Sequence, residues 1–537
     1  MPAKLVKRTL LDRVIGYFNP GRGLERLRDR TMLSVYTGGG GYAGGKRDRR
    51  ATKGWLPGEG SADADILPAL TGLRSRSRDL ARNVPVASGA IATNKTHVIG
   101  CGLVLNAQCN RDTLGLTEEQ AGEFNRLAQQ EFALFCKSVD FTKVQQFAEL
   151  EAMGFGGALE SGDMFAIRRY RLDPGDIYGT KVQMIEADMV CNPFHMSDTE
   201  TLVAGIEHTR QGMPIAVHVT DRHPGDVRRV RLNWRRVPMR YNDGRRIVLH
   251  LLDRQRPGQT RGIPYLAPVV EALKSLGDYT DAEVRAAVVS AMFTVFVKGA
   301  PNPGSGPLPT TGKGSDDRGE LAMGAGAVVD LAEGEEVEFA NPMRPNPQFD
   351  AFVTSFLRQI GVALEMPFEL LIKHFTSSYS ASRAALEMAY HTFRRRRAWM
   401  VRNFHEPIYE WFMEEAVLLG RLDAPGFFED PLMRAAWLNA SWIGPVRISL
   451  DPKKDAEADK IDVEMRVKTR EQVVQERTGG DIDRKIEQGN REAAAISGGA
   501  APSASPVDAG SDASGDDTDR DDSNADETDE PEEDQND

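Results

Sequence analysis

The sequence predicts an α+β fold: a mixed region of helices and strands, two long helices separated by a strand-containing insert, and a helical C-terminal region. Apolar residues recur at helical spacing through about 61–150 and again through 264–297. Short segments rich in β-branched residues occupy the interval from about 150 to Asp253. The chain of 537 residues is long enough for a sizeable core and for two to four domains.

Residues 1–60 are predicted to form an arm. Within it, 38–60 is rich in glycine and basic residues and has little to bury, which favours a segment lying on another surface. The basic start lacks the apolar core and cleavage site of a secretory signal, so we expect a cytoplasmic setting. No apolar run approaches the roughly 18 residues that span a bilayer, so no membrane partner is expected.

Residues 61–262 are expected to form a mixed domain. Its first half shows helical spacing, and its second half is broken by Gly, Pro and Asp into short strand-like segments. These segments are MFAIRRY, KVQMIEADMV, TLVAGIEH, IAVHVT and RRIVLHLL.

The next region predicts two helices around an insert. Residues 264–297 form a long helix candidate that stops at Lys298 and Gly299. An insert rich in Gly and Pro follows, and GAVVDLAEGEEVEFANP then alternates like strands around a Gly-Glu turn. A helix resumes over 347–364.

A run of hydroxyl side chains in HFTSSYSASRAAL leads into another long helix. From Ser382, apolar residues hold one face over about 25 residues, and Pro407 is expected to kink or break this helix. Residues 431–495 read as helical and charged. The composition beyond Ala501 is typical of disorder.

The charge is divided unevenly along the chain. The net charge is -12, but 501–537 holds 15 acidic residues and one arginine, so the remainder is close to neutral.

Sequence motifs indicate no catalytic, cofactor or metal site. The stretch from Gly40 to Lys46 has phosphate-loop spacing, yet Arg47 stands where Ser or Thr would hold magnesium, and no packed helix follows. The segment around Ser161 lacks a nucleophile elbow, and the nine histidines show no metal-ligand spacing. The four cysteines show no paired spacing, which favours incidental thiols over zinc or disulfides.

Two arginine clusters allow two interpretations each. Residues 222–261 hold twelve arginines, which could contact phosphate or pair with carboxylates on strand faces; the second interpretation is favoured. Four successive helical arginines, Arg394, Arg395, Arg396 and Arg397, point to all sides of their helix and must meet water, acids or neighbouring chains. We therefore expect them to form subunit contacts.

Four long phrases in register resemble the portal proteins of tailed bacteriophages, in their lambda-like branch. The resemblance covers about Trp55 to Glu492 and excludes the Gly-rich stretch and the acidic tail. Its phrases lie at 73–103 (LRSRSRDLARNVPVASGAIATNKTHVIGCGL), 251–287, 339–386 (FANPMRPNPQFDAFVTSFLRQIGVALEMPFELLIKHFTSSYSASRAAL) and 450–461 (LDPKKDAEADKI).

The resemblance implies a ring, usually of twelve subunits, at one capsid vertex, with a central channel for double-stranded DNA. It implies a portal fold with a wing, long stem helices, a clip and a helical crown. The implied boundaries are the N-terminal arm 1–60, wing 61–262, first stem helix 263–298, clip 299–345, second stem helix 346–364, tunnel-loop region 365–381, long kinked helix 382–430, crown 431–500 and acidic tail 501–537.

The hydroxyl-rich stretch then approximates the tunnel loop that projects into the channel. Its expected channel-lining residues are Lys373, His374, Thr376, Ser377, Ser378 and Tyr379. Serine and threonine make weak, exchangeable contacts, whereas a ring of arginine–phosphate contacts would hold DNA that has to slide. The expected partners are copies of the chain itself, DNA, a terminase packaging motor, a head–tail connector, and major capsid and scaffolding proteins.

The resemblance implies a structural protein of the virion, assembled in the host cytoplasm, without enzymatic activity or cofactors. Two alternatives remain. A nucleic-acid-processing enzyme would need a clustered acidic metal site, which cannot be assigned outside the tail. A capsid scaffolding or adaptor protein would be mostly helical and would lack the strand-containing insert.

Overall fold

The computed structural model describes residues 15, 17, 20–34, 57–226, 231–291, 295–299, 335–339, 348–375, 378–446, 451–478 and 482–498. The chain divides into two units, Met1–Gly479 and Gly480–Asp537, and each is described by itself. Among the described helices, none is both long and apolar enough to cross a membrane.

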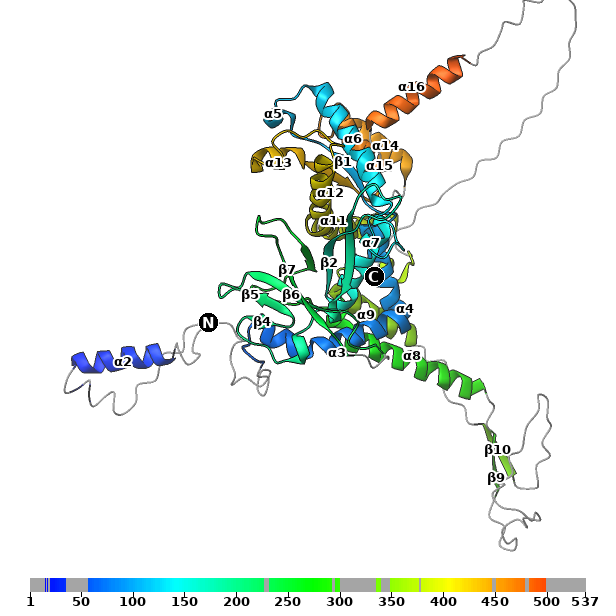
Figure 1. Ribbon diagram of the computed structural model, residues 1–537. Coiled ribbons are helices and arrows are strands. Elements are labelled where there is room, and N and C mark those ends of the chain that lie inside the picture. Colours follow the sequence, from blue (N-terminus) through cyan, green and yellow to red (C-terminus); the bar gives the residue numbers. More distant parts are fainter. Residues whose placement is uncertain are drawn as a thin grey trace, which may run out of the picture. The chain divides into compact units, whose positions relative to one another are not determined.

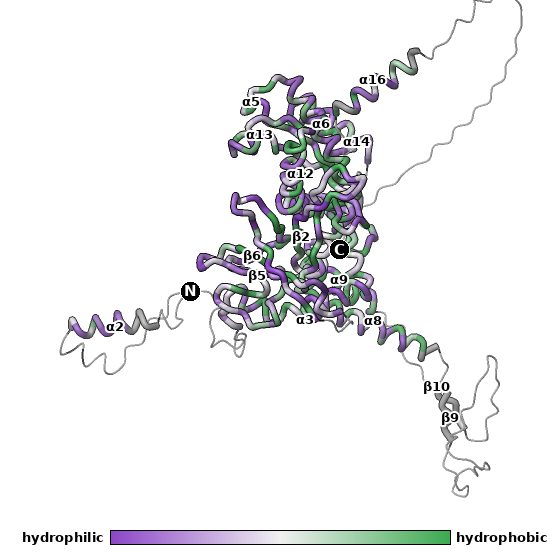
Figure 2. Tube along the Cα trace, viewed as in Figure 1, coloured by the Kyte–Doolittle hydropathy of each residue, from purple (hydrophilic) through white to green (hydrophobic). Residues whose placement is uncertain are grey.

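Helices dominate the N-terminal part of the first unit (Figure 1). Within the predicted arm lies α2 (Pro20–Ser34), whose trace is largely hydrophilic (Figure 2). The helices that follow are α3 (Ala62–Asn83), α4 (Pro85–Val98), α5 (Arg111–Leu114), α6 (Glu118–Cys136) and α7 (Phe147–Ser161). The Ser61 hydroxyl caps α3, and a Thr117–Gln120 capping box starts α6, so these boundaries follow from local sequence.

The predicted strand segments form two antiparallel sheets. The first has the order β3-β2-β8, from β2 (Asp163–Tyr170), β3 (Thr180–Glu186) and β8 (Val248–Leu252). The second has the order β4-β5-β6-β7, from β4 (Leu202–Val203), β5 (Ile206–His208), β6 (Pro214–Thr220) and β7 (Trp234–Pro238). The mixed α+β prediction and its end near Asp253 are confirmed.

The two sheets share a small apolar core of their own. Phe165 and Ile185 of the first sheet lie in one buried cluster with Val217 and Val237 of the second. Alternating residues of a strand face opposite sides, so one face of each sheet supplies this core.

The first long helix is shorter than predicted. After the 3-10 turn Ala267–Val269, α8 spans Val270–Ala291, and Val295–Gly299 forms strand β9 instead of the helix end. Strand β9 pairs antiparallel with β10 (Glu335–Phe339), and the two lie side by side in Figure 1. The helical prediction to 297 was wrong because the β-branched residues there have a strand partner beyond the insert.

A strand in the second half of GAVVDLAEGEEVEFANP is confirmed as β10, whereas the first half lies outside the described residues. The helix predicted over 347–364 is α9 (Phe349–Ala363). It packs against α8, because the ring of Tyr279 lies 5.6 Å from that of Phe349 and 5.1 Å from that of Phe352. Short α10 (Phe368–Ile372) follows.

The second long helix is continuous past Pro407. It consists of α11 (Tyr379–Met400), a π-helical turn (Val401–His405) and α12 (Glu406–Leu418). Pro407 is the second residue of α12, and the wider π turn directly before it is where the ladder of backbone hydrogen bonds is interrupted. The helix ends at Leu418, before the predicted boundary at 430.

The C-terminal region contains a strand as well as helices. After α13 (Pro431–Trp437), β11 (Ala440–Ile443) pairs antiparallel with β1 (Val104–Ala107). Helices α14 (Pro452–Glu464) and α15 (Arg470–Thr478) complete the first unit, and α16 (Ile482–Gly498) belongs to the second. The acidic tail lies outside the described residues.

The main core joins distant segments. The ring of Phe132 on α6 makes edge contacts with Phe147, Tyr409, Phe412 and Trp442, with ring centroids 5.2–5.7 Å apart. Edge-to-face rings at this spacing attract one another beyond their area burial. Helices α6, α7 and α12 and strand β11 are thereby held in one body.

Candidate functional site

The predicted tunnel-loop residues lie where α10 ends and α11 begins. Lys373 adopts a left-handed conformation with φ +56° and ends α10, and the backbone N–H of His374 donates to the Glu369 carbonyl at 3.0 Å. Lys373, His374 and Ser378 are exposed. Thr376 and Ser377 lie outside the described residues.

Tyr379 is the first residue of α11 rather than a loop residue. Its ring lies 5.6 Å from the Lys454 ammonium, and nearby Arg383 of α11 pairs with Asp455 at 3.4 Å. Tyr379, Arg383 and Asp455 line a pocket with His97. The start of α14 therefore packs against the start of α11, immediately after the predicted loop.

Arg395 and Arg396 both bind Glu365, at the turn between α9 and α10. The Arg396 guanidinium also donates to the Asn94 side chain and lies 4.6 Å from the centre of the Tyr265 ring. The Tyr265 hydroxyl donates in turn to the Leu364 carbonyl at 2.5 Å. These arginines hold the α9–α10 turn against α4, α11 and the segment just before α8.

Arg397 binds three backbone carbonyls, at His97 (2.8 Å), Val98 (3.1 Å) and Pro445 (2.9 Å). Burial lowers the pKa of His97, and the charges of Arg397 and Lys373 add to this effect. Arg394 lies over the Tyr390 ring at 6.0 Å. Three of the four successive arginines thus have polar partners within their own chain, and contact with another subunit stays a prediction.

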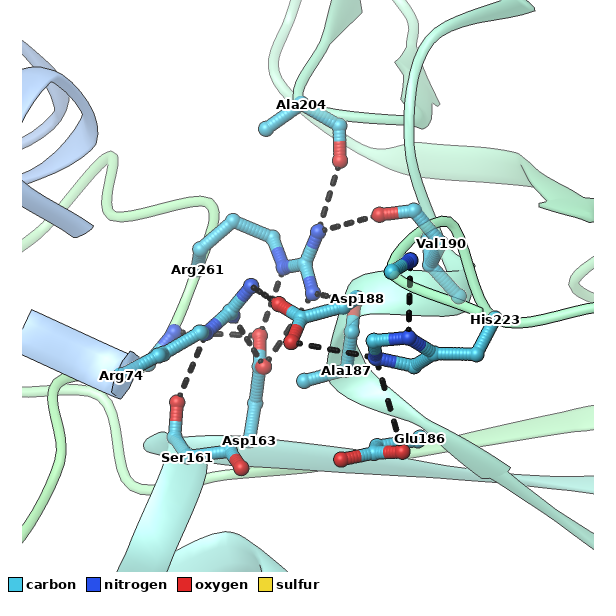
Figure 3. A network of polar contacts seen from close by, with 12 residues as sticks. Arg74, Ser161, Asp163, Glu186, Ala187, Asp188, Val190, Ala204, His223 and Arg261 are labelled. Atoms are coloured by element: carbon cyan, nitrogen blue, oxygen red, sulfur yellow. Dashed lines mark hydrogen bonds and ion pairs between the residues drawn. The ribbon is translucent and has the colours of Figure 1, made fainter. Parts of the chain in front are cut away.

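A buried charge network that the sequence did not predict lies where β2 begins (Figure 3). Asp163 is fully buried and accepts hydrogen bonds from Arg74 at 2.6 Å and Arg261 at 2.7 Å. Burial raises the pKa of Asp163, but Arg261 and Arg74 outweigh it and hold that pKa far below its usual range. His250 contacts the same carboxylate at 3.0 Å.

The network ties the two sheets to α3. Arg261 also donates to the carbonyls of Ala187 (2.6 Å), Val190 (2.8 Å) and Ala204 (2.8 Å). An added Cβ at Gly262 would lie 1.9 Å from the Gly162 carbonyl, so two glycines let the chain segments meet. In the sequence, the residues that meet here stand in two short phrases, ESGD (with Gly162 and Asp163) and TRGIP (with Arg261 and Gly262), each of which places a charged residue beside a glycine.

One group of metal-ligand side chains lies at the edge of this network. Single ligand atoms of Glu186, Asp188 and His223 lie within 4.8 Å of one another. Arg78 already contacts Glu186 at 2.9 Å and Asp188 at 2.5 Å. Arg74 also contacts Asp188, at 3.1 Å, so two guanidinium groups balance the two carboxylates and their chemistry fits an ion-pair cluster better than a cation site.

Several arginines of the segment 222–261 pair with carboxylates of the same chain. Among its described residues, Arg236 pairs with Glu207, Arg245 with Asp243, Arg256 with Asp65 and Arg261 with Asp163. These pairs confirm the carboxylate interpretation for four arginines. Arg228 and Arg229 lie outside the described residues.

Comparisons with known proteins agree with the phrases noted in the sequence. Residues 48–397 match the model of the family described as "Phage portal protein, lambda family". The chain is 26% identical to the portal protein of Escherichia phage N15 over 483 residues, covering 85% of this chain and 89% of that protein. It is 25% identical to portal protein B of Escherichia phage lambda over 495 residues, covering 88% and 91%.

Solved structures give a weaker likeness. A chain from the virion of a native gene transfer agent particle has a TM-score of 0.40 at 13% identity, covering 79% of this chain and 96% of that one. A chain from the neck of the native particle has a TM-score of 0.40 at 14% identity, covering 75% and 96%. On the family match, which spans most of its length, the chain belongs to the lambda family of phage portal proteins.

Proposed function

We propose that this portal protein assembles as a closed ring, with twelve subunits expected from the family, around a channel for double-stranded DNA at one vertex of the capsid. The observation that carries the proposal is the family match over 48–397. That range contains α8, the β9–β10 pair, α9 and the segment from Lys373 to Tyr379.

The domain layout of the family applies to the observed elements as follows. The wing comprises the two sheets and the helices α3 to α7. Helices α8 and α9 are the stem, and β9 and β10 belong to the clip. The edges of this two-stranded sheet can take further strands from neighbouring clips or from docking proteins. The antiparallel pair also favours a portal over a scaffolding protein, which would lack a strand-containing insert.

The segment from Lys373 to Ser378 is the tunnel loop in this proposal. Its described members Lys373, His374 and Ser378 are exposed. The contacts of Arg395 and Arg396 with Glu365 hold the turn before α10, which gives the loop a rigid support on one side. The pairing of Arg383 with Asp455 supports the other side.

The ring conducts DNA and docks other proteins, and we propose no enzymatic activity of its own. ATP hydrolysis belongs to a separate terminase motor. The ring resides in the virion after assembly in the host cytoplasm, and contacts the major capsid protein, scaffolding protein and head–tail connector.

Electron microscopy of the purified chain in negative stain tests the assembly. We expect closed rings with a central hole, and light scattering should give a mass many times the 59.2 kDa of one chain. A single species of monomer mass at all salt and protein concentrations would overturn the proposal.

A further inference from the structure

Two arginines, one from each sheet, lie at the rim of the core that the two sheets share. Arg169 belongs to β2 and Arg235 to β7. Alternate residues of a strand lie on one face, so Arg169 is on the same face of β2 as Ile167 of the shared core. In the same way, Arg235 is on the same face of β7 as Val237. Because Arg169 is half-buried and Arg235 is exposed, both lie where this core meets solvent.

The guanidinium of Arg169 has an incomplete set of hydrogen bonds. Its Nε donates to the side-chain oxygen of Gln183 at 2.8 Å. Its Nη2 is buried and has no hydrogen-bond partner among the described residues. A buried N–H group without an acceptor costs free energy, and an oxygen atom supplied by a ligand would remove that cost. Since the residue as a whole is only half-buried, a ligand can reach the guanidinium with a small change of the side-chain rotamer.

Neither arginine has an acidic partner. Within the described ranges of the chain, no carboxylate oxygen forms an ion pair with Arg169 or Arg235 at 4.0 Å or less. Burial lowers the pKa of Arg169, and the charge of Arg235 lowers it further, so the two cations are close enough to repel one another. By contrast, the next residue, Arg236, faces the other side of β7 and pairs with Glu207 at 2.7 Å.

The side chains gathered at this rim can donate hydrogen bonds to an anion. Each guanidinium presents a fork of N–H groups that matches the oxygens of a phosphate. The carboxamide of Gln183 accepts from Arg169 through its oxygen, and its NH2 group can donate to a ligand. A further cation, Lys181, stands opposite Arg169 in the sheet, but it pairs with Asp176 at 2.9 Å and is not needed.

We propose that Arg169, Arg235 and Gln183 form a binding site for a tetrahedral oxyanion, namely phosphate, between the two sheets. A phosphate dianion places negative charge between two cations and so removes their repulsion. It has enough oxygens for both guanidinium forks, whereas a single carboxylate fills one. The bound anion links β2 to β7 and thereby holds the two sheets together. This inference depends neither on the ring nor on the channel.

Isothermal titration calorimetry of the full chain with sodium phosphate tests the proposal, with chloride used to keep the ionic strength constant. We expect one phosphate per chain, with a dissociation constant below about 5 mM. At a tenfold excess over that constant, phosphate should raise the midpoint of thermal unfolding by about 1–3 °C, because it binds the folded state only. A short DNA duplex, titrated separately, distinguishes free phosphate from the phosphates of a nucleic acid.

The variant Arg235→Gln removes one guanidinium from an exposed position. It should weaken phosphate binding about fivefold or more and abolish the rise in the unfolding midpoint. Arg235→Lys keeps the charge without the fork, so its affinity should lie between those of the parent and Arg235→Gln. The matched control is Arg231→Gln, which removes an exposed arginine just before β7 and should bind phosphate like the parent.

Stability without phosphate separates a binding role from a purely structural one. In phosphate-free buffer, Arg235→Gln should unfold no earlier than the parent, because it loses a contact between like charges. An arginine that only stabilised the fold would give a lower unfolding midpoint under these conditions. The variant Arg169→Gln should show the same loss of phosphate binding, and if it does not fold, the Arg235 variants decide alone.

Several results would overturn the proposal. They are no phosphate binding by the parent up to about 20 mM, equal binding by the parent and Arg235→Gln, or an equal loss in Arg231→Gln. Binding of the duplex that depends on Arg235, without any binding of free phosphate, would assign the arginine pair to a nucleic-acid backbone and would also overturn it.

Discussion

The Arg261 guanidinium lies 2.7 Å from the carboxylate of Asp163, 98 residues earlier in the chain, and both side chains are buried. Arg74 contacts the same carboxylate from α3. Two buried cations thus depend on one buried anion, so the stability of this part of the fold should be sensitive to the loss of the Asp163 charge.

Asp163→Asn should destabilise the protein by about 3–5 kcal/mol, because Arg74 and Arg261 would remain buried with their main counter-ion gone. Urea unfolding measures the change. Asp112→Asn is the matched control, since its carboxylate is 89% exposed beside Arg111, and it should change the free energy of unfolding by less than about 1 kcal/mol. Similar losses in both variants would contradict this account.

Stability at acid pH should depend on the same carboxylate. The folded-state pKa of Asp163 is depressed, so its contribution is complete above the unfolded pKa of about 3.9 and is lost as pH falls toward the folded pKa. In that window the unfolded chain binds one more proton, which removes about 1.4 kcal/mol per pH unit. Unfolding free energies from about pH 4 down to about pH 2 should therefore fall more steeply in the parent than in Asp163→Asn, and parallel curves would count against this.

The triple variant T376R/S377R/S378R should form rings but package DNA poorly. Each added cation binds phosphate and deepens the resting positions of a sliding duplex, and every subunit repeats the change. The defect should lessen as salt rises. A packaging assay beside gel filtration measures both properties. The triple change to Asn keeps the loop polar and uncharged, so it should package normally. Normal packaging by the arginine variant would refute the tunnel assignment.

Arg396→Ala should cost more stability than Arg395→Ala. The Arg396 side chain is 15% exposed, lies over the Tyr265 ring and binds Asn94, whereas that of Arg395 is 65% exposed. We expect about 1–3 kcal/mol for Arg396→Ala and below about 1 kcal/mol for Arg395→Ala. Thermal unfolding ranks the two, and the yield of rings in gel filtration should fall in the same order. The reverse order would show that the α9–α10 turn does not depend on Arg396.

Much of the fold could be predicted because its signals are local. The period of apolar residues over Phe349–Ala363, and the short segments broken by Gly, Pro and Asp that contain β2 and β3, mark these elements without knowledge of any partner. Capping residues such as Ser61 add the boundaries. The family resemblance likewise rests on runs of residues that can be recognised in the sequence alone.

The chain's local patterns determined its helices, most of its strands, its uneven charge and its family. Only the tertiary structure decided which distant groups meet. It paired β1 with β11 and β9 with β10, and it placed Asp163 between Arg74 and Arg261. It also placed Glu365 of the same chain in contact with both Arg395 and Arg396. The physical reason is that periodicity reports which side of an element is buried, whereas the partner of a strand edge or a buried charge depends on contacts across tens to hundreds of residues.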